Sequence, residues 1–255
     1  MVKEEHTPVI ELRGLHKSFG AQKVLNGLNL RIPRGRITVI IGRSGEGKSV
    51  LLKTMIGLLQ PDEGEVRVEG QEFFELSDQG QNELRKKFGM LFQHAALFDS
   101  MNVLENVAFP LREHTEMGED EIRAKVVEKL SRVGLKDIEH KMPSELSGGM
   151  RKRVGLARAL MLDPEIILYD EPTTGLDPIL TDSIDNLILE TQKGFGLTSV
   201  VVSHDIQSTM KMADNVAMLY EGRILEQGPP RAFQESKDPW IQKFLQGKAD
   251  KDFIG

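Results

Sequence analysis

The 255-residue chain has no cysteine, which excludes disulfide bonds, thiolate catalysis and cysteine-based zinc sites. Its apolar runs are short or interrupted, well below the roughly 20 residues that span a bilayer. The stretch MVKEEHTPVIEL at the start is charged and does not have the apolar core of a secretion signal. We therefore expect a cytoplasmic location, with any membrane role supplied through a partner.

The chain also has fewer positive than negative side chains: 33 Lys and Arg against 39 Asp and Glu, which gives a formal net charge of −6. Domains that bind duplex nucleic acid usually carry a basic balance or stripe. The small basic clusters at 85–87 and 151–153 are better explained as solvated helix faces. The sequence thus predicts no nucleic-acid partner. The overall composition is that of an ordinary globular protein.

Strand and helix patterns alternate along the chain, which predicts an α/β fold. Residues 9–41 indicate short strands in an antiparallel layer that leads into a buried strand, and 77–162 are mostly helical in period. The other expected elements are a helix after Ser49, a strand at 64–70, buried strands EIILYD and LTSVVVSH around a helix at 178–194, a hairpin at 215–228 and a helix at 239–246. The strand–helix–strand part predicts a parallel pair.

GRSGEGKS at 42–49 fits the phosphate-binding pattern G-x-x-x-x-G-K-[ST] and lies between a predicted strand and a predicted helix. Glycines let the backbone wrap around phosphate, Lys48 would reach the β- and γ-phosphates, and the Ser49 hydroxyl would bind Mg²⁺. The predicted ATP-binding loop comprises Gly42, Arg43, Ser44, Gly45, Glu46, Gly47, Lys48, Ser49 and Val50.

Carboxylates and a histidine follow the two buried strands at the edge where open α/β sheets place ligands. Asp170 is predicted to reach Mg²⁺ through water, and Glu171 to polarise the attacking water as general base. His204 follows the next strand and would hydrogen-bond the γ-phosphate. The alternatives are a pair of solvated acids before a Pro turn and a structural histidine.

LSGGM at 146–150 opens a second helical run, so Ser147, Gly148 and Gly149 would place a positive helix N-terminus behind free amides. The phosphate loop is expected to surround the nucleotide of its own subunit, so this second anion-binding segment is expected to contact the nucleotide of a partner subunit. In a two-fold homodimer with each ATP between the two subunits, both segments bind phosphate. The alternative is an N-cap without a ligand.

These motifs, together with TGLD at 174–177 and SHD at 203–205, occur in the order found in the ATPase subunits of ATP-binding cassette (ABC) transporters, which the chain resembles over nearly its whole length. The resemblance implies a P-loop NTPase with a RecA-like core, an N-terminal antiparallel β-subdomain and an inserted α-helical subdomain at about 95–162. It implies a single ATPase domain over 1–246 and a C-terminal tail over 247–255.

By the same resemblance, Phe19 stacks on adenine with Val24 beside it, and Gln93 links Mg²⁺ to the transport subunit. Gln93 joins Lys48, Glu171 and His204 in the implied catalytic set, and joins Ser49 and Asp170 in the implied metal set. Asp177 would cross the dimer interface. The alternatives are a strand-core role for Phe19 and an exposed helix amide for Gln93.

Two positions depart from the common family pattern, because Met150 replaces a glutamine and Val50 replaces a hydroxyl residue. These changes weaken side-chain contacts to the partner's ribose and to the α-phosphate. GKSVLLK, FPLREHT and SELSGGMRKRVGLARAL resemble the Mla/Mce branch, whose members move phospholipids between the inner and outer membranes. That resemblance implies a peripheral location at the cytoplasmic face of the inner membrane, and it allows for lipid-binding and small accessory subunits.

The segment from Gln93 to Phe109 is rich in apolar residues, and a cytoplasmic helix of a membrane permease is predicted to dock there. The apolar set is Ala96, Leu97, Phe98, Met101, Val103, Leu104 and Phe109. The alternative is that they form the core of the helical subdomain. Other readings of the function are a transporter ATPase for an amino acid, lipoprotein or drug, and a soluble ABC ATPase acting on ribosomes or DNA, which a single cassette without a heptad insertion disfavours.

Trp240, Phe244 and Leu245 form an apolar face near the C-terminus. Two readings follow: the tail after Gly247 touches the other subunit, or this face packs on its own subunit, which is the favoured reading.

Overall fold

A computed structural model describes residues 8–247, and the predicted tail from 248 onward lies outside the described residues. The N-terminal part is an antiparallel sheet of strand order β2-β1-β4-β5. Its strands are β1 (Pro8–Phe19), β2 (Gln22–Pro33), β4 (Glu63–Val68) and β5 (Gln71–Glu72). Alternate apolar residues of β1 and β2 are buried, as expected of a sheet with one covered face. The predicted antiparallel layer is therefore present.

The second sheet has six strands in the order β10-β9-β3-β8-β7-β6. They are β3 (Ile37–Ile41), β6 (Phe88–Leu91), β7 (Ile166–Asp170), β8 (Thr198–Ser203), β9 (Asn215–Tyr220) and β10 (Arg223–Gly228). All neighbours are parallel except β10, which pairs antiparallel to β9 at the edge. Every residue of β3, β7 and β8 is buried, which explains their continuous apolar sequences.

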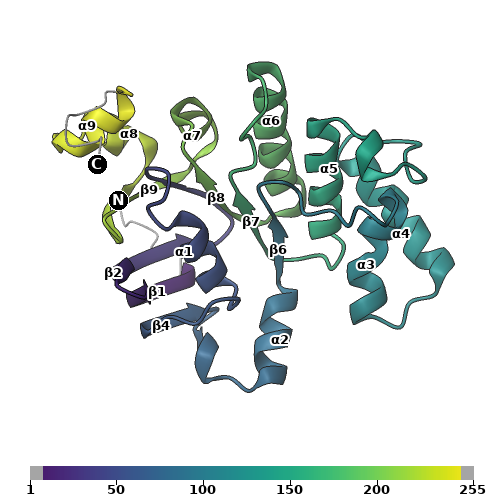
Figure 1. The fold of residues 1–255 in the computed structure, drawn as a ribbon, viewed down its shortest axis with the longest axis horizontal. Helices are drawn as coiled ribbons and strands as arrows, with labels where there is room; N and C mark the ends of the chain where they lie inside the picture. The colour runs from purple at the N-terminus through teal and green to yellow at the C-terminus, as the bar shows by residue number, and fades with distance from the viewer. Residues whose placement is uncertain (1–7, 248–255) are drawn as a thin grey trace, which may run out of the picture.

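Helices cover the sheets and form a separate lobe, on the right of Figure 1. The lobe holds α3 (Val103–His114), α4 (Glu119–Arg132) and α5 (Gly148–Ala159), which pack on one another. The remaining helices are α1 (Lys48–Met55), α2 (Asp78–Lys86), α6 (Pro178–Phe195), α7 (Ile206–Met212), α8 (Pro230–Glu235) and α9 (Pro239–Leu245), with 3₁₀ turns at Phe73–Glu75 and Pro143–Glu145.

Two apolar clusters lie on opposite faces of the six-stranded sheet. Val39 and Ile41 belong to the cluster shared with the helical lobe, whereas Ile40 belongs to the cluster shared with α1 and the N-terminal sheet. Successive side chains of a strand point to opposite faces, so β3 contributes to both clusters. The central sheet thereby connects the lobe to the rest of the chain, with the carboxyl ends of β3, β8 and β7 side by side.

Strand β6 was not predicted, because residues 77–162 are mostly helical in period. The four residues FGML pair in parallel with β7, from Phe88 opposite Ile166 to Leu91 opposite Tyr169. A strand this short, with a glycine and no β-branched residue, has a weak local preference, so the pairing decides. Gln93 consequently lies in the turn after β6 and is half-buried, so it is not an exposed helix amide.

Within residues 8–247, the longest apolar helical stretches fall short of what a bilayer crossing requires.

Trp240 packs its ring on Tyr220 of the same chain, with 4.9 Å between the ring centroids, and Phe244 and Leu245 pack against the core. The apolar face of α9 therefore contacts its own subunit, as one of the two readings predicted.

Candidate functional site

The glycine-rich loop joins the end of β3 to the start of α1. Gly45 and Gly47 have φ angles of 84° and 94°, in the left-handed region that favours glycine. A Cβ on Gly47 would lie 2.5 Å from Cγ1 of Val24, so the loop can approach β2 only without a side chain there. Gly47 is also the N-cap of α1, which directs backbone amides of the loop toward an anion.

Lys48 is 5% exposed, and its ammonium donates to the carbonyl oxygens of Gly42 at 2.9 Å and Arg43 at 2.8 Å. Its Nζ lies 3.8 Å from Oε1 of Glu171. Burial lowers the pKa of Lys48, and the nearby carboxylates, Glu171 first, oppose that shift. The cation is therefore held in the loop by carbonyl and carboxylate oxygens from two segments of the chain.

Ser49 and Asp170 meet across the gap between α1 and β7. The Ser49 hydroxyl donates to Oδ1 of Asp170 at 2.9 Å, and Asp170 is only 7% exposed. Burial raises the pKa of Asp170, and the hydrogen bond from Ser49 acts in the opposite direction. A hydroxyl and a buried carboxylate at this spacing are the hard oxygen donors that Mg²⁺ prefers, so these residues fit the metal.

Glu171 follows Asp170 with a φ of 45°, an uncommon conformation for a residue other than glycine. Its Oε2 accepts a hydrogen bond from the Thr174 hydroxyl at 2.8 Å and lies 3.3 Å from Nδ1 of His204. Its amide donates to the carbonyl oxygen of Val202 on β8 at 3.0 Å. The structure thus brings together Lys48, Glu171 and His204, although Lys48 lies more than a hundred residues before the other two.

A cavity of about 410 Å³ borders the glycine-rich loop. Its lining comprises Gln22, Lys23, Val24, Arg43, Ser44, Gly45, Glu46, Glu221 and Gly222. Val24 therefore lies beside the loop. Phe19, at the end of β1, is not among the lining residues of this cavity. Its side chain is 50% exposed, so the alternative of a strand-core role is wrong.

The turn between β9 and β10 was not expected in this region. The amide of Glu221 donates to Oε2 of Glu46 at 2.9 Å, which ties the turn to the glycine-rich loop. A Cβ on Gly222 would lie 2.7 Å from the carbonyl oxygen of Val24, so the turn also requires glycine for its close approach. No local sequence signal relates the hairpin to the loop, because they are about 175 residues apart.

Lys152 on α5 is a second residue that the sequence analysis missed. It is 6% exposed, and its ammonium donates to the carbonyl oxygen of Gln93 and, at 3.5 Å, to that of Glu171. The neighbouring Arg153 donates to Val133 and Ser183. The prediction that 151–153 is a solvated helix face is therefore wrong for two of its three residues. A signal existed, because a residue four positions before buried Leu156 shares its helix face.

Ser147, Gly148 and Gly149 lie apart from this group. The Ser147 hydroxyl caps α5 by accepting from the amide of Met150 at 3.2 Å, and Asp177 caps α6 by accepting from the amides of Ile179 and Leu180. A Cβ on Gly149 would touch Leu180, so the two helix starts are adjacent. In Figure 1, the strands β6 to β8 separate α5 from α1, which carries Lys48.

Comparisons with known proteins agree with these features. The family model described as ABC transporter matches residues 25–174. The probable ribonucleotide transport ATP-binding protein mkl of Mycobacterium leprae is 46% identical over 94% of this chain and 69% of its own length. The intermembrane phospholipid transport system ATP-binding protein MlaF of Haemophilus influenzae is 43% identical over 95% of this chain and 92% of its own.

A solved structure, the ATP-binding cassette MJ0796 as a post-hydrolysis dimer bound to ADP and Pi, aligns with a TM-score of 0.79 and 33% identity. The alignment covers 87% of this chain and 99% of that one. The family resemblance and the P-loop NTPase fold predicted from the sequence are thereby confirmed. The chain belongs to the ABC transporter family, as an ATP-hydrolysing subunit.

Proposed function

We propose that the chain works as one half of a homodimer that hydrolyses ATP at two shared sites and thereby drives a separate membrane permease. One observation carries the proposal: helix α5, which begins at Gly148, and helix α1, which carries Lys48, lie on opposite sides of strands β6 to β8 in Figure 1. Two sets of phosphate-binding amides that cannot reach one nucleotide from the same subunit can reach it from two. The dimeric state of MJ0796 supports a dimer for this chain as well.

Within each ATP site, different residues would bind the metal, neutralise the phosphates and activate water. Ser49 and Asp170 would hold Mg²⁺, with Gln93 beside it, and the metal supplies charge neutralisation at the β- and γ-phosphates. Lys48 lies in the loop to neutralise the same phosphates. Glu171 accepts the proton of the attacking water, while Thr174 and His204 hold its carboxylate in place.

The nucleotide base would lie at the cavity beside Val24, with Phe19 stacking from the exposed end of β1. From the partner, Ser147, Gly148, Gly149 and Asp177 would complete the site.

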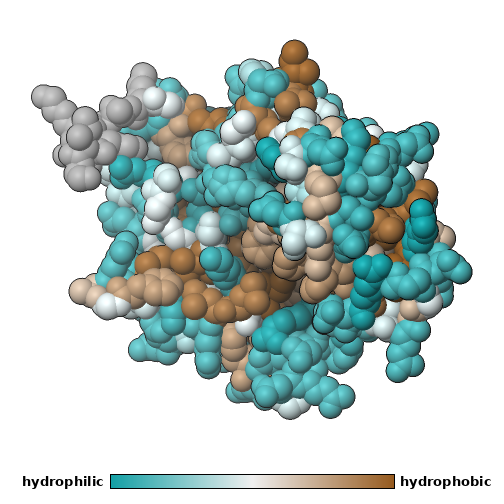
Figure 2. Space-filling view, turned by 45° about the vertical axis from the view of Figure 1, so that its right-hand side comes forward, coloured by the Kyte–Doolittle hydropathy of each residue, from teal (hydrophilic) through white to brown (hydrophobic). Residues whose placement is uncertain are grey.

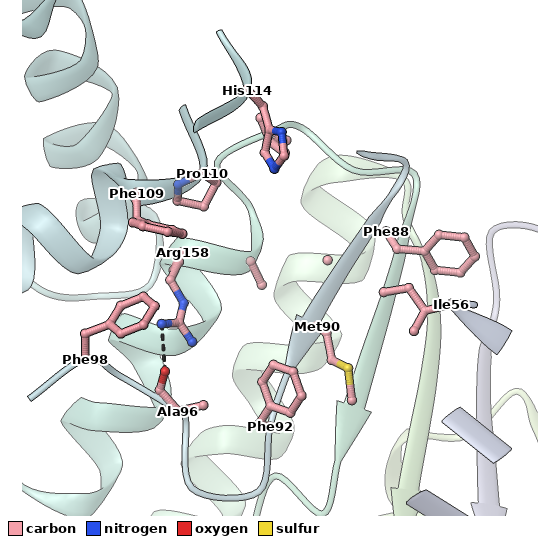
Figure 3. A pocket seen from close by; sticks show the side chains of 13 residues that line it. Ile56, Phe88, Met90, Phe92, Ala96, Phe98, Phe109, Pro110, His114 and Arg158 are labelled. Atoms are coloured by element: carbon pink, nitrogen blue, oxygen red, sulfur yellow. Dashed lines mark hydrogen bonds between the residues drawn. The ribbon is translucent and has the colours of Figure 1, made fainter. Parts of the chain in front are cut away.

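A second cavity, of about 480 Å³, lies between β6, α3 and α5 (Figure 3). Its lining is mostly apolar and includes Met90, Phe92, Ala96, Phe98, Phe109 and Pro110. Arg158 donates to the carbonyl oxygens of Ala95 at 2.7 Å and Ala96 at 2.8 Å, which holds the turn after β6 at the cavity wall. Figure 2 shows apolar residues around a hollow near the middle of the turned face.

The apolar segment that the sequence analysis assigned to permease docking divides into two groups. Ala96, Phe98 and Phe109 line the cavity, whereas Leu97 and Leu104 pack against the core. Val103 is fully buried and Met101 is not in the lining, so the alternative of a subdomain core holds for part of the set. We propose that an amphipathic helix of the permease docks against the cavity residues, directly beside Gln93.

The cargo most consistent with the relatives is phospholipid, moved between the inner and outer membranes by a complex on whose cytoplasmic face this subunit lies. The observation that favours it is the identity to MlaF, over nearly the full length of both chains. The name of mkl specifies ribonucleotide transport, so a ribonucleotide cargo is the alternative outcome of the test.

Purification of the tagged subunit with its membrane partner tests both parts. Phe98→Glu should abolish co-purification of the permease, because it places a charge on a 42% exposed ring at the cavity wall. Leu225→Glu is the matched control, since Leu225 is 39% exposed on β10 at the opposite edge of the sheet. Retention of the permease by Phe98→Glu would place docking elsewhere. Lipid analysis of the purified complex should find phospholipid, and a nucleotide cargo without it would overturn the lipid proposal.

A further inference from the structure

The buried ammonium of Lys152 contacts two of the segments that carry proposed catalytic residues. One acceptor is the carbonyl oxygen of Gln93, in the turn beside the docking cavity, and the other is that of Glu171, at the end of β7. These segments come from different strands of the sheet, while Lys152 itself belongs to the helical lobe. A single side chain thus joins three parts of the chain.

A charge at this position is costly. Burial lowers the pKa of Lys152, and the carboxylates of Glu171 and Asp170 oppose the shift from a distance. Buried charges are often replaceable by apolar residues without loss of stability, so packing alone does not account for a lysine here. The contacts with two carbonyl oxygens are what an apolar residue could not supply.

Lys152 lies close to the start of α5, where Ser147, Gly148 and Gly149 are proposed to contact the partner's nucleotide. The helix begins at Gly148 with Ser147 as its cap, so Lys152 lies about one turn, roughly 6 Å, from the amides that would grip the partner's nucleotide. Because one helical turn is stiff, a displacement of that helix start would move Lys152 and, through it, the carbonyls of Gln93 and Glu171.

We propose that Lys152 is a positioning residue that couples the two ATP sites of the dimer. Through it, engagement of the Ser147–Gly149 helix start with the partner's ATP aligns Glu171 of the same subunit on its own ATP. The inference rests on the proposed homodimer. It assigns Lys152 no contact with nucleotide, so ATP binding to the separate subunit does not depend on it.

Steady-state hydrolysis gives the first test. Lys152→Met should lower kcat about 10-fold or more and reduce the Hill coefficient for ATP from near 2 to about 1, with the Kd for ATP of the monomer unchanged. Lys152→Arg, which retains donors and charge, should recover most of kcat. Arg151→Gln removes a charge from the exposed neighbouring position of α5 and should behave as wild type. Cooperativity retained in Lys152→Met would overturn the proposal.

Mixed dimers distinguish coupling between sites from a local effect. In each, one subunit carries Glu171→Gln, so a single site hydrolyses ATP, and the single-turnover rate of phosphate release is measured. Lys152→Met should slow that site when placed in the subunit with the intact Glu171 and have no effect in the Glu171→Gln subunit. When the Glu171→Gln subunit also carries Lys48→Ala, which weakens its own ATP binding, the helix start of the intact subunit has little nucleotide to engage, and Lys152→Met should cause no further slowing. Full slowing by Lys152→Met in that background would show a local role and overturn the coupling.

If Lys152→Met does not fold, Lys152→Gln replaces it, and its thermal midpoint is recorded. A rate loss that Lys152→Arg fails to recover, alongside a lowered midpoint, would overturn the positioning role in favour of a structural one. Failure of the homodimer itself appears separately, as an ATP-bound Glu171→Gln protein that stays monomeric.

Discussion

Glu171→Gln isolates the role of the carboxylate with little change in shape. The amide keeps an oxygen that can accept from the Thr174 hydroxyl, now 2.8 Å from Oε2, but it cannot take a proton from water. Loss of a general base typically costs about 10²–10⁴ in rate, which is about 3–5 kcal/mol of activation free energy. We expect kcat to fall by that factor while ATP still binds.

The substitution also removes the carboxylate that lies 3.8 Å from Nζ of Lys48. Since that carboxylate opposes the effect of burial, the pKa of Lys48 should fall further in the variant. The loop carbonyls of Gly42 and Arg43 still hold the ammonium, so its position is expected to persist.

Two measurements check this prediction. Phosphate release gives kcat, and size-exclusion chromatography with ATP and Mg²⁺ should show Glu171→Gln as a persistent dimer, because bound ATP is no longer hydrolysed. Glu190→Gln, an exposed change on α6, is the control and should retain wild-type kcat. A kcat for Glu171→Gln within about 10-fold of wild type would refute the assignment of the general base.

Three further changes test the energetics of the fold and site. Gly57→Ala should destabilise by about 2–3 kcal/mol in urea unfolding, because φ is 71° and the new Cβ would lie 2.0 Å from the Phe73 ring; an unchanged midpoint would contradict this. Asp170→Asn should raise the thermal midpoint at pH 7, because burial raises the pKa of Asp170 and the folded state therefore disfavours its carboxylate. The increase in midpoint should vanish as pH falls toward 3.8, and an increase at all pH values would contradict an origin in the buried charge. Glu69→Gln should lower the free energy of unfolding by at most about 3 kcal/mol above pH 5, because hydrogen bonds from Lys87 and Arg34 lower the pKa of Glu69 to about 2. This loss of stability should shrink as pH falls from 4.5 to 2, and a loss that does not depend on pH would argue against ion pairing.

Local sequence determined the parts of the site that depend on neighbours in the chain. The glycine spacing before Lys48 and Ser49 predicts a phosphate loop because glycine adopts the positive φ angles of such a loop without a steric penalty. Asp170, Glu171 and His204 follow apolar strands, and parallel strands bring their carboxyl ends to one edge, so their proximity was predictable too. The structure places these side chains within a few ångströms of one another.

Only the tertiary structure decided which residues of the remaining segments are buried. Strand β6 exists because β7 offers it a parallel partner, not because FGML prefers extended backbone. Leu97 and Phe98 are adjacent and equally apolar in pattern, yet Leu97 packs on the core and Phe98 lines the cavity between β6, α3 and α5. The helical period indicates the buried face of Lys152, but its contacts with Gln93 and Glu171 require α5 to pack beside β6, a segment some 60 residues earlier in the chain.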